Sequence, residues 1–364
     1  MSFTLHGLGT ALPSGRVTQA EALACTRVLA PPAVREASWL PAVYRHSEIR
    51  TRHQALGRPL VEDLLHGTRD SGSPFLPREP AGNFGPTTAE RMRLYADGAP
   101  PLAVTASANA LAESGFAADT ITHLVTVSCT GFAAPGVDLA LISGLGLRPT
   151  VERTHVGFMG CHGALNGLRV ANAFATADPS ARILLACVEL CSLHYSYGEE
   201  PERVVANAIF ADGAAAVVGS GRGDGWNVRA SGSCLIPGSA DAMHWRVGDH
   251  GFEMGLSRRI PALIATHVRP WLERWLGDSG LSLEAVGSWA VHPGGPKIVS
   301  AVEEALTLPA GATAASRAVY AEHGNMSSPT VLFVLDALRR QNAPRPCVAL
   351  GFGPGLVAEA VLFD

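Results

Sequence analysis

The sequence predicts a mixed α/β protein built from two similar halves, and three observations lead to this prediction. Apolar, β-branched runs typical of buried strands alternate with stretches that carry apolar residues at helical spacing. A turn-rich junction at residues 221–225 divides the chain into halves of 1–220 and 221–364, and the alternation continues in the second half. Hydrophobic residues make up 47% of the 364 residues and charged residues 16%, which is the composition of a globular chain with a large core.

In the first half, the pattern predicts helices and strands in a definite order. A glycine-rich opening precedes predicted helices at 18–28 and 39–46, and the Pro-, Gly- and Ser-rich residues 68–88 predict an irregular excursion. The elements expected after it are helices at 102–114, 136–144 and 161–178, and strands at 123–130, 153–157, 182–189 and 214–219. The helix that opens at Cys161 is expected to end near Asp178 because the following proline cannot continue it.

The second half shows the same kinds of element. Helical spacing of apolar residues predicts helices at 261–276, 297–306 and 329–340. Short apolar runs bounded by turn residues predict strands at 288–292, 347–350 and 356–363. Alternating strands and helices in both halves indicate sheets that are covered by helices.

Composition and charge argue against several classes of protein. The formal net charge is -4 with no acidic or basic block, so bulk charge predicts no nucleic-acid partner. The first residues lack the pattern of a signal peptide, and no apolar run reaches the roughly 18 residues that a membrane span needs. We therefore expect a cytoplasmic protein without a membrane span. Seven scattered cysteines with no CxxC pair argue against a disulfide framework and against a zinc site.

Cys161 is the strongest candidate for a nucleophile. Residues 156–164 predict the end of a strand, a tight glycine turn and a helix that opens at the cysteine. The positive end of a helix dipole stabilises an anion, so we expect a lowered pKa for this thiol and a nucleophilic thiolate. The ordinary alternative is a buried structural cysteine, which is how we interpret the other six.

Two further residues stand where they could meet the cysteine. His292 follows a predicted strand and precedes a Pro-Gly-Gly-Pro turn, at the kind of strand end where sheets bind ligands. Asn325 lies among glycine and small residues just before a predicted helix. A lone histidine is more often a core residue and such an asparagine more often a cap or turn residue. Their positions along the chain alone do not show that they meet.

Four motifs, in the same order along the chain, resemble those of the chalcone and stilbene synthase family, the type III polyketide synthases. They are Gly160-Cys161, His292-Pro-Gly-Gly-Pro296, Gly324-Asn-Met-Ser-Ser328 and Gly351-Phe-Gly-Pro-Gly355. The resemblance covers nearly the whole chain, and residues 209–216 match the segment with the family's gatekeeper phenylalanine, here Phe210. It implies a thiolase-like fold of two pseudo-duplicated halves in α-β-α-β-α layers. Residues 1–220 would carry the nucleophile, and residues 221–364 the catalytic histidine and asparagine.

The resemblance implies an acyltransferase that condenses CoA thioesters. Cys161, beside His292, would take a starter group from acyl-CoA, and malonyl-CoA would lose CO2 to give an enolate that His292 and Asn325 stabilise. Repeated Claisen condensation and cyclisation would give a pyrone or a resorcinol or other phenolic ring. The family's enzymes are homodimers, and this chemistry requires no cofactor and no metal.

The resemblance also assigns side chains to the substrate cavity and to the CoA site. The expected cavity residues are Phe210, Met254, Cys129, Ala134, Cys191, His194 and Ser327, with Phe252 as the alternative to Met254. The expected CoA contacts are Arg45, Arg50, Gly294, Gly295 and Lys297, the only lysine. Cys129, Cys191 and His194 stand where the plant enzymes carry threonines, and Ala134 where they carry a methionine that reaches the partner subunit's cavity.

These departures from the plant enzymes indicate which starter to expect. Small side chains at Ala133 and Ala134, together with two cysteines, predict room for a long fatty acyl chain.

Three alternative functions remain open. They are a condensing enzyme similar to ketoacyl-ACP synthase III, a non-catalytic thiolase-fold scaffold, and a papain-like hydrolase. The His-Pro-Gly-Gly-Pro motif argues against the first, the complete Cys-His-Asn set against the second, and the sequence around the cysteine against the third.

Overall fold

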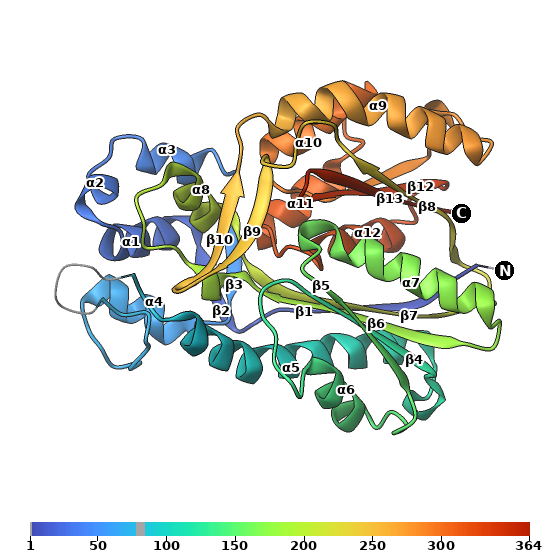
Figure 1. Ribbon diagram of the computed structural model, residues 1–364, viewed down its shortest axis with the longest axis horizontal. Helices are drawn as coiled ribbons and strands as arrows, with labels where there is room; N and C mark the ends of the chain where they lie inside the picture. Colours follow the sequence, from blue (N-terminus) through green and yellow to red (C-terminus); the bar gives the residue numbers. More distant parts are fainter. Residues whose placement is uncertain (1, 78–83) are drawn as a thin grey trace.

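Five layers stack through the molecule in the order helix, sheet, helix, sheet, helix, as Figure 1 shows. The computed structural model describes residues 2–77 and 84–364. Residues 78–83, part of the predicted irregular segment, lie outside the described residues. The layered α/β architecture that the sequence predicts is confirmed.

The first half supplies five strands, in the order β5-β4-β6-β7-β1 across the sheet. Their bounds are Thr4–Ala11 for β1, His123–Ser128 for β4, Glu152–Gly157 for β5, Arg182–Leu190 for β6 and Asp212–Ser220 for β7. β4 is parallel to β5 and β6, whereas β7 is antiparallel to β6 and to β1. β4 and β7 are buried along their whole length, which explains why their sequences are continuous apolar runs without alternation.

The second half contributes four strands, in the order β11-β12-β13-β8. Their bounds are Trp226–Leu235 for β8, Ser288–Val291 for β11, Cys347–Gly353 for β12 and Val357–Phe363 for β13. A parallel step from β11 to β12 is followed by antiparallel steps to β13 and β8, as in β4-β6-β7-β1 of the first half. The two sets are joined into one nine-stranded sheet where Thr4 and Leu5 of β1 pair with β8.

Helices separate and cover these two sets of strands. The middle layer contains α7 (Gly163–Ala177), α11 (Ala314–His323) and α12 (Thr330–Arg340), and the outer layers contain α5 (Thr88–Ser114) and α6 (Val137–Leu145), or α9 (Ile260–Asp278) and α10 (Pro296–Leu306). Leu168 of α7 and Leu332 of α12 belong to one buried cluster with Val125 of β4 and Val361 of β13. This apolar middle layer holds the two halves together.

β1 was not predicted from the sequence, and α5 begins well before the predicted helix at 102–114. Gly7 and Gly9 weaken the strand pattern of β1, but a Cβ there would lie 2.1 Å from the carbonyl oxygen of Ala110 and 2.3 Å from that of Ala106. The glycines therefore allow α5 to lie directly on β1. Pro100 and Pro101 suggest a helix boundary, yet α5 runs through them from a capping box at Thr87.

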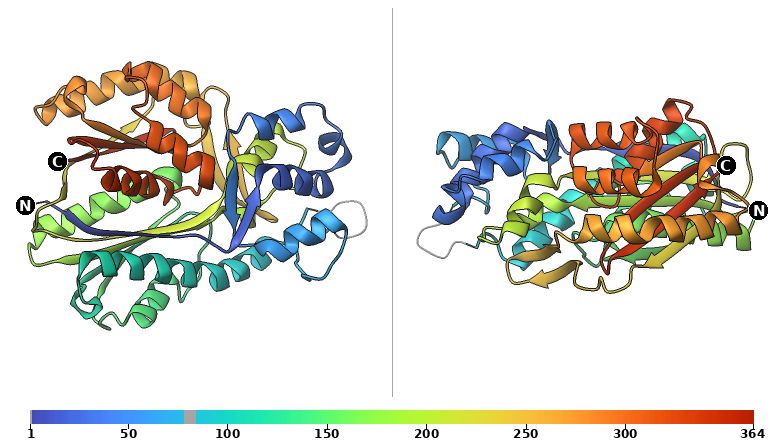
Figure 2. Two further views of the ribbon diagram at one scale, coloured as in Figure 1. Left: turned by 180° about the vertical axis from the view of Figure 1, so that it is seen from behind. Right: turned by 90° about the horizontal axis from the view of Figure 1, so that it is seen from above.

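Small N-terminal elements gather at one end of the molecule, as Figure 2 shows. They are β2 (Gly15–Thr18), α1 (Gln19–Leu29), α2 (Pro32–Arg35), α3 (Leu40–Arg45), β3 (Thr51–Gln54) and α4 (Gly57–His66). Of these, α1 and α3 contact α8 (Pro201–Ile209), which in turn packs against a hairpin of β9 (Met243–Gly248) and β10 (Gly251–Leu256). None of the helices in the described part of the chain has the length and hydropathy that a membrane crossing requires.

Candidate active site

Cys161 lies in the tight turn between β5 and α7, as the sequence predicts. It is the middle residue of a short 3-10 turn, Gly160–His162, that runs directly into α7. Gly160 has a φ of 66°, and a Cβ there would lie 2.7 Å from the ring of Pro354. Only glycine fits this turn without strain, and the turn directs the cysteine toward the interior. The Cys161 side chain is buried, and it lines two cavities.

Asn325 reaches the same sulfur from the other half of the chain. Its side-chain amide lies 3.9 Å from the Cys161 Sγ atom. The Oδ1 atom accepts a hydrogen bond of 2.8 Å from the backbone N–H of Ser327. This bond fixes the orientation of the amide. Its Oδ1 and Nδ2 atoms both lie 3.9 Å from the sulfur, so Oδ1 can accept the thiol proton while the Nδ2–H2 group can donate to a group bound there.

His292 follows β11 and completes the group. Its backbone N–H donates to the carbonyl of Leu350 at 2.7 Å, which anchors it beside β12. It lines the same cavity as Cys161 and Asn325, and its side chain is 1% exposed. Neither of its ring nitrogens has a hydrogen-bond partner among the described residues. The imidazole is therefore free to exchange a proton with a group in the cavity.

Burial shifts the pKa values of Cys161 and His292 in opposite directions. Burial raises the pKa of the Cys161 thiol to about 11, although nearby Ser327 and Asn325 oppose the shift. Burial, together with nearby His162, lowers the pKa of His292 to about 3. The expectation that the helix terminus lowers the pKa of the thiol is therefore wrong for this structure, because desolvation dominates. Each group is neutral at pH 7, so His292 is in the form that can accept the thiol proton.

Two cavities meet at Cys161. One has a volume of about 340 Å³ and the other of about 490 Å³, and both are lined by Cys161, Phe210, Met243 and Met254. His292 and Asn325 line only the larger cavity. Phe210 thus lines both of the spaces that share one thiol.

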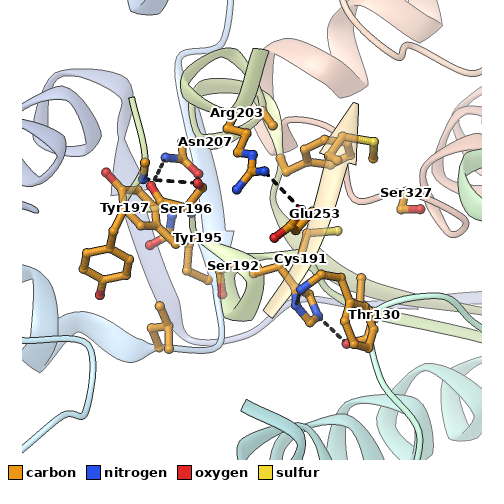
Figure 3. A pocket seen from close by; sticks show the side chains of 18 of the residues that line it. Thr130, Cys191, Ser192, Tyr195, Ser196, Tyr197, Arg203, Asn207, Glu253 and Ser327 are labelled. Atoms are coloured by element: carbon orange, nitrogen blue, oxygen red, sulfur yellow. Dashed lines mark hydrogen bonds and ion pairs between the residues drawn. The ribbon is translucent and has the colours of Figure 1, made fainter. Parts of the chain in front are cut away.

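The smaller cavity contains most of the predicted cavity residues, and Figure 3 shows part of its lining. Phe210, Met254, Cys129, Cys191, His194 and Ser327 all line it, as does Phe252. His194 accepts the N–H of Phe252 at 2.9 Å on Nδ1, and its Nε2 lies 2.6 Å from the carbonyl of Thr130. Burial lowers the pKa of His194 to about 3. It is therefore a neutral bridge that attaches β10 to the segment after β4.

The same cavity continues between α1 and α4, a region that was not predicted to line it. There it is lined by Val17, Ala22, Cys25, Leu60, Val61 and Leu64. All six are buried and belong to one hydrophobic cluster. We call this part of the cavity the α1–α4 lobe.

The larger cavity contains three of the five predicted CoA residues. Gly294, Gly295 and Lys297, at the start of α10, line it, and so do His46 and Arg258. Arg45 and Arg50 are not among its lining residues, and Arg50 instead pairs with Glu322 at 3.0 Å. Arg258 was not among the predicted residues. No local signal distinguishes Arg258 from the adjacent Arg259.

Ala134 lines neither of these two cavities. It lies in an exposed loop beside Phe132, which is 55% exposed. Phe158 and Met159, just before the turn that contains Cys161, are 37% and 43% exposed, and the rings of Phe132 and Phe158 are 6.4 Å apart. We call Phe132, Ala134, Phe158 and Met159 the apolar face.

Comparisons with known proteins agree along the whole chain. Residues 2–222 match the family model "Chalcone and stilbene synthases, N-terminal domain", and residues 227–364 match the C-terminal domain model of the same family. The chain is 36% identical to "Alpha-pyrone synthesis polyketide synthase-like Pks18" of Mycobacterium tuberculosis, over 99% of this chain and 90% of that protein. It is 35% identical to 1,3,6,8-tetrahydroxynaphthalene synthase of Streptomyces peucetius, over 97% of this chain and 90% of that one.

A solved structure extends the likeness to three dimensions. The crystal structure of PKS-I from the brown alga Ectocarpus siliculosus superposes with a TM-score of 0.91 and 32% sequence identity. The superposition covers 100% of this chain and 98% of that one. The likeness therefore includes both halves and the segments that carry the site.

Proposed function

The chain belongs to the chalcone and stilbene synthase family, the type III polyketide synthases, and we propose that Cys161, His292 and Asn325 are its catalytic residues. Enzymes of this family are transferases that condense CoA thioesters. The observation that carries the assignment is that one buried thiol, one unpartnered imidazole and one oriented amide line the same cavity, and that the thiol also lines a second cavity.

The first step is the loading of a starter acyl group on Cys161. The sulfur attacks the carbonyl of acyl-CoA while its proton passes to neutral His292. The bond to the CoA sulfur then breaks, and the CoA thiolate takes up the proton. Two buried groups that each resist charge favour a proton transfer that is concerted with bond formation, because the charges then arise side by side and attract each other.

The second step is extension by malonyl-CoA. Loss of CO2 leaves the electron pair on the α-carbon, and the thioester oxygen carries the enolate charge. The Nδ2–H2 group of Asn325 and an N–H of His292 donate to this oxygen. The enolate carbon attacks the acyl thioester, and the Cys161 thiolate leaves, ready to accept the longer chain. Phe210, between the two cavities, screens the enolate from water.

CoA binding is assigned to the mouth of the larger cavity. Lys297 and Arg258 are exposed there, and α10 begins with Pro296 as its first helical residue. A helix N-terminus with nearby cations is well suited to phosphate groups. The pantetheine arm would follow the cavity past Gly294 and Gly295 toward Cys161.

The pKa shifts lead to a prediction for the pH dependence of Cys161. In a His292→Gln variant, nothing replaces the base, so thiolate forms only by ordinary ionisation against a pKa of about 11. The alkylation rate with iodoacetamide, without acyl-CoA, should then rise about tenfold per pH unit between pH 7 and 10. The wild type should show a flatter profile, since His292 accepts the proton. Identical slopes would show that His292 does not act on this thiol.

We propose a long acyl chain as the starter and the α1–α4 lobe as its site. The lobe is apolar, buried and continuous with Cys161, and burial of each CH2 group contributes about 0.8 kcal/mol. Growth of the chain and ring closure would then give a pyrone or a resorcinol or other phenolic product. One relative is named for α-pyrone synthesis and another for tetrahydroxynaphthalene.

Filling the lobe should shorten the preferred starter. Ala22→Phe adds a ring inside the lobe, whereas Val28→Phe on the same helix adds one at a position that is 41% exposed. With starters from C2 to C16 and malonyl-CoA, Ala22→Phe should lose roughly tenfold or more in kcat/KM for C12 to C16 and little for C2 to C6. Val28→Phe should match the wild type. A uniform loss for all starters would contradict the assignment of the lobe.

The function itself is tested by mass spectrometry of products from the purified protein, malonyl-CoA and this starter panel. Products that contain the starter plus several C2 units support the proposal. If neither CoA ester is consumed, the assignment of substrates fails. A single added C2 unit would point to one condensation only.

We also propose a homodimer that associates through the apolar face. Phe132 and Phe158 expose large aromatic surfaces next to the site, where association with a second copy would bury them. Sedimentation at micromolar concentration should give twice the chain mass, and Phe132→Asp should shift the protein toward monomer. A monomeric wild type would exclude this interface.

The proposal includes a division of the chain into two halves and a cytoplasmic location. A division into 1–220 and 221–364 is supported by the repeated strand order and by family models that meet between residues 222 and 227. Separate expression of the halves, followed by mixing, would test it.

A cytoplasmic location is supported by seven free cysteines, six of them buried. Fractionation of the source cells would test that assignment.

A further inference from the structure

Arg52 is a buried cation on β3 beside the gatekeeper segment. It is 2% exposed and lines the smaller cavity. Its Nη1 atom donates hydrogen bonds of 2.7 Å to the carbonyl of Asn207 and 2.8 Å to the carbonyl of Phe210. Its Nε atom has no partner among the described residues. Burial of a guanidinium costs free energy unless hydrogen bonds compensate for the lost solvation.

The two carbonyls that Arg52 binds belong to the C-terminal end of α8. This helix ends at Ile209, and Phe210 is its capping residue with extended backbone angles. The last carbonyls of a helix carry the negative end of its dipole and have no partners within the helix. Arg52 supplies a charged donor to both and thereby fixes the direction in which the backbone of Phe210 leaves the helix.

The same backbone is attached to Asn325. The N–H of Ala211 donates to the carbonyl of Asn325 at 2.8 Å, and the N–H of Asn325 donates to the carbonyl of Ile209 at 2.9 Å. Gly324 packs into the same junction, where a Cβ would lie 3.1 Å from the Ile209 carbonyl oxygen and 3.5 Å from the Arg52 Cβ. The Arg52 side chain and the backbones of Phe210 and Asn325 are thus connected by a short chain of hydrogen bonds.

We propose that Arg52 is a positioning residue that holds Phe210 and Asn325 in register and so couples decarboxylation to condensation. This inference rests on the proposed function. Phe210 lines both cavities, and Asn325 faces the sulfur that carries the acyl group. When the C-terminal turn of α8 shifts, the aromatic ring and the amide shift together. The enolate then forms in a site that water can reach and that no longer directs it at the thioester.

An enolate that forms on malonyl-CoA has two fates. Its carbon either attacks the acyl-Cys161 carbonyl, which forms the C–C bond and releases the thiolate, or takes a proton from water and becomes acetyl-CoA. Both fates release one CO2. The ratio of acetyl-CoA to polyketide therefore measures how well the site is held, independently of the total amount of active protein.

The test compares Arg52→Met with Arg52→Lys and the wild type. Methionine keeps an unbranched side chain but removes the donors, and lysine keeps a cation that can reach one carbonyl. We expect Arg52→Met to raise the ratio of acetyl-CoA to polyketide by about tenfold, since small displacements of reacting groups have effects of this size or larger. Acylation of Cys161 by the starter, followed by intact-protein mass spectrometry, should change little. Arg52→Lys should recover part of the coupling.

Arg91→Met is the matched control for stability. Arg91 is also a buried guanidinium bonded to main-chain carbonyls, those of Pro86 at 2.8 Å and Tyr195 at 3.0 Å among them. Its bonds do not reach Phe210 or Asn325. This variant should lower the melting temperature as Arg52→Met does, but leave the ratio at the wild-type value. Equal ratios in the two variants would reduce Arg52 to a structural role and overturn the inference.

The outcome also separates this inference from the proposed function. If the wild type forms no polyketide from the two CoA esters, the proposed function fails. If the wild type condenses them and Arg52→Met keeps the wild-type ratio, the proposed function stands and the coupling role of Arg52 is wrong.

Discussion

Cys161→Ala is expected to abolish polyketide formation, by more than about a thousandfold, because the other cysteines of the smaller cavity do not line the larger cavity that contains His292 and Asn325. Decarboxylation of malonyl-CoA should persist in this variant, since the donors of His292 and Asn325 remain. The products are polyketide and acetyl-CoA, and both are measured by mass spectrometry of the same reaction. This separation distinguishes loss of the nucleophile from collapse of the site.

The matched control for this variant is Cys187→Ala. Cys187 is fully buried on β6 and lines neither cavity. Its replacement should cost some stability and leave the product spectrum intact. Polyketide that survives in Cys161→Ala would exclude Cys161 as the carrier and would direct attention to another cysteine of the cavity.

The second large effect is expected for Asn325→Ala. Loss of one enolate donor should lower the rates of decarboxylation and extension by about a hundred- to a thousandfold. Loading of the starter should continue, because the thiol and His292 remain in place. Intact-protein mass spectrometry measures acylation of Cys161, and release of CO2 from malonyl-CoA measures the extension half-reaction.

Asn325→Asp sharpens this test. Aspartate keeps the shape and can still accept the N–H of Ser327, but a carboxylate has no donor and repels an enolate. It should therefore be at least as inactive as alanine in decarboxylation. Full decarboxylation activity in either variant would show that the Nδ2–H2 group of Asn325 does not stabilise the enolate.

The two variants together assign different steps to different parts of the site. Cys161→Ala should stop loading and keep decarboxylation, whereas Asn325→Ala should keep loading and stop decarboxylation. The geometry supports this division because the asparagine amide is oriented by Ser327 without help from the sulfur, at 3.9 Å. A single reaction mixture analysed for acyl-enzyme, acetyl-CoA and polyketide distinguishes the two patterns.

The sequence by itself determined the elements that are buried on both faces and the turn that presents Cys161, the proposed nucleophile. Continuous apolar runs predicted β4, β6 and β7, and Gly160 with Cys161 predicted the tight turn into α7. These features depend on local chemistry, namely the spacing of apolar residues and the positions of proline and glycine. Four motifs in order were enough to indicate the family. The order of strands and its repetition in the two halves could not be read in this way.

Only the tertiary structure decided the features that depend on which segments meet. Gly7 and Gly9 made β1 hard to predict, because glycine is unusual in a strand. Both glycines are required by the close packing of α5, which lies far along the chain. His46 and Arg258, rather than Arg45 and Arg50, line the larger cavity. The α1–α4 lobe forms because α1 and α4, which are separated along the chain, pack side by side next to the cavity that contains Cys161. Burial likewise set the pKa directions of Cys161 and His292, and burial is a property of the packed chain, which no single segment contains.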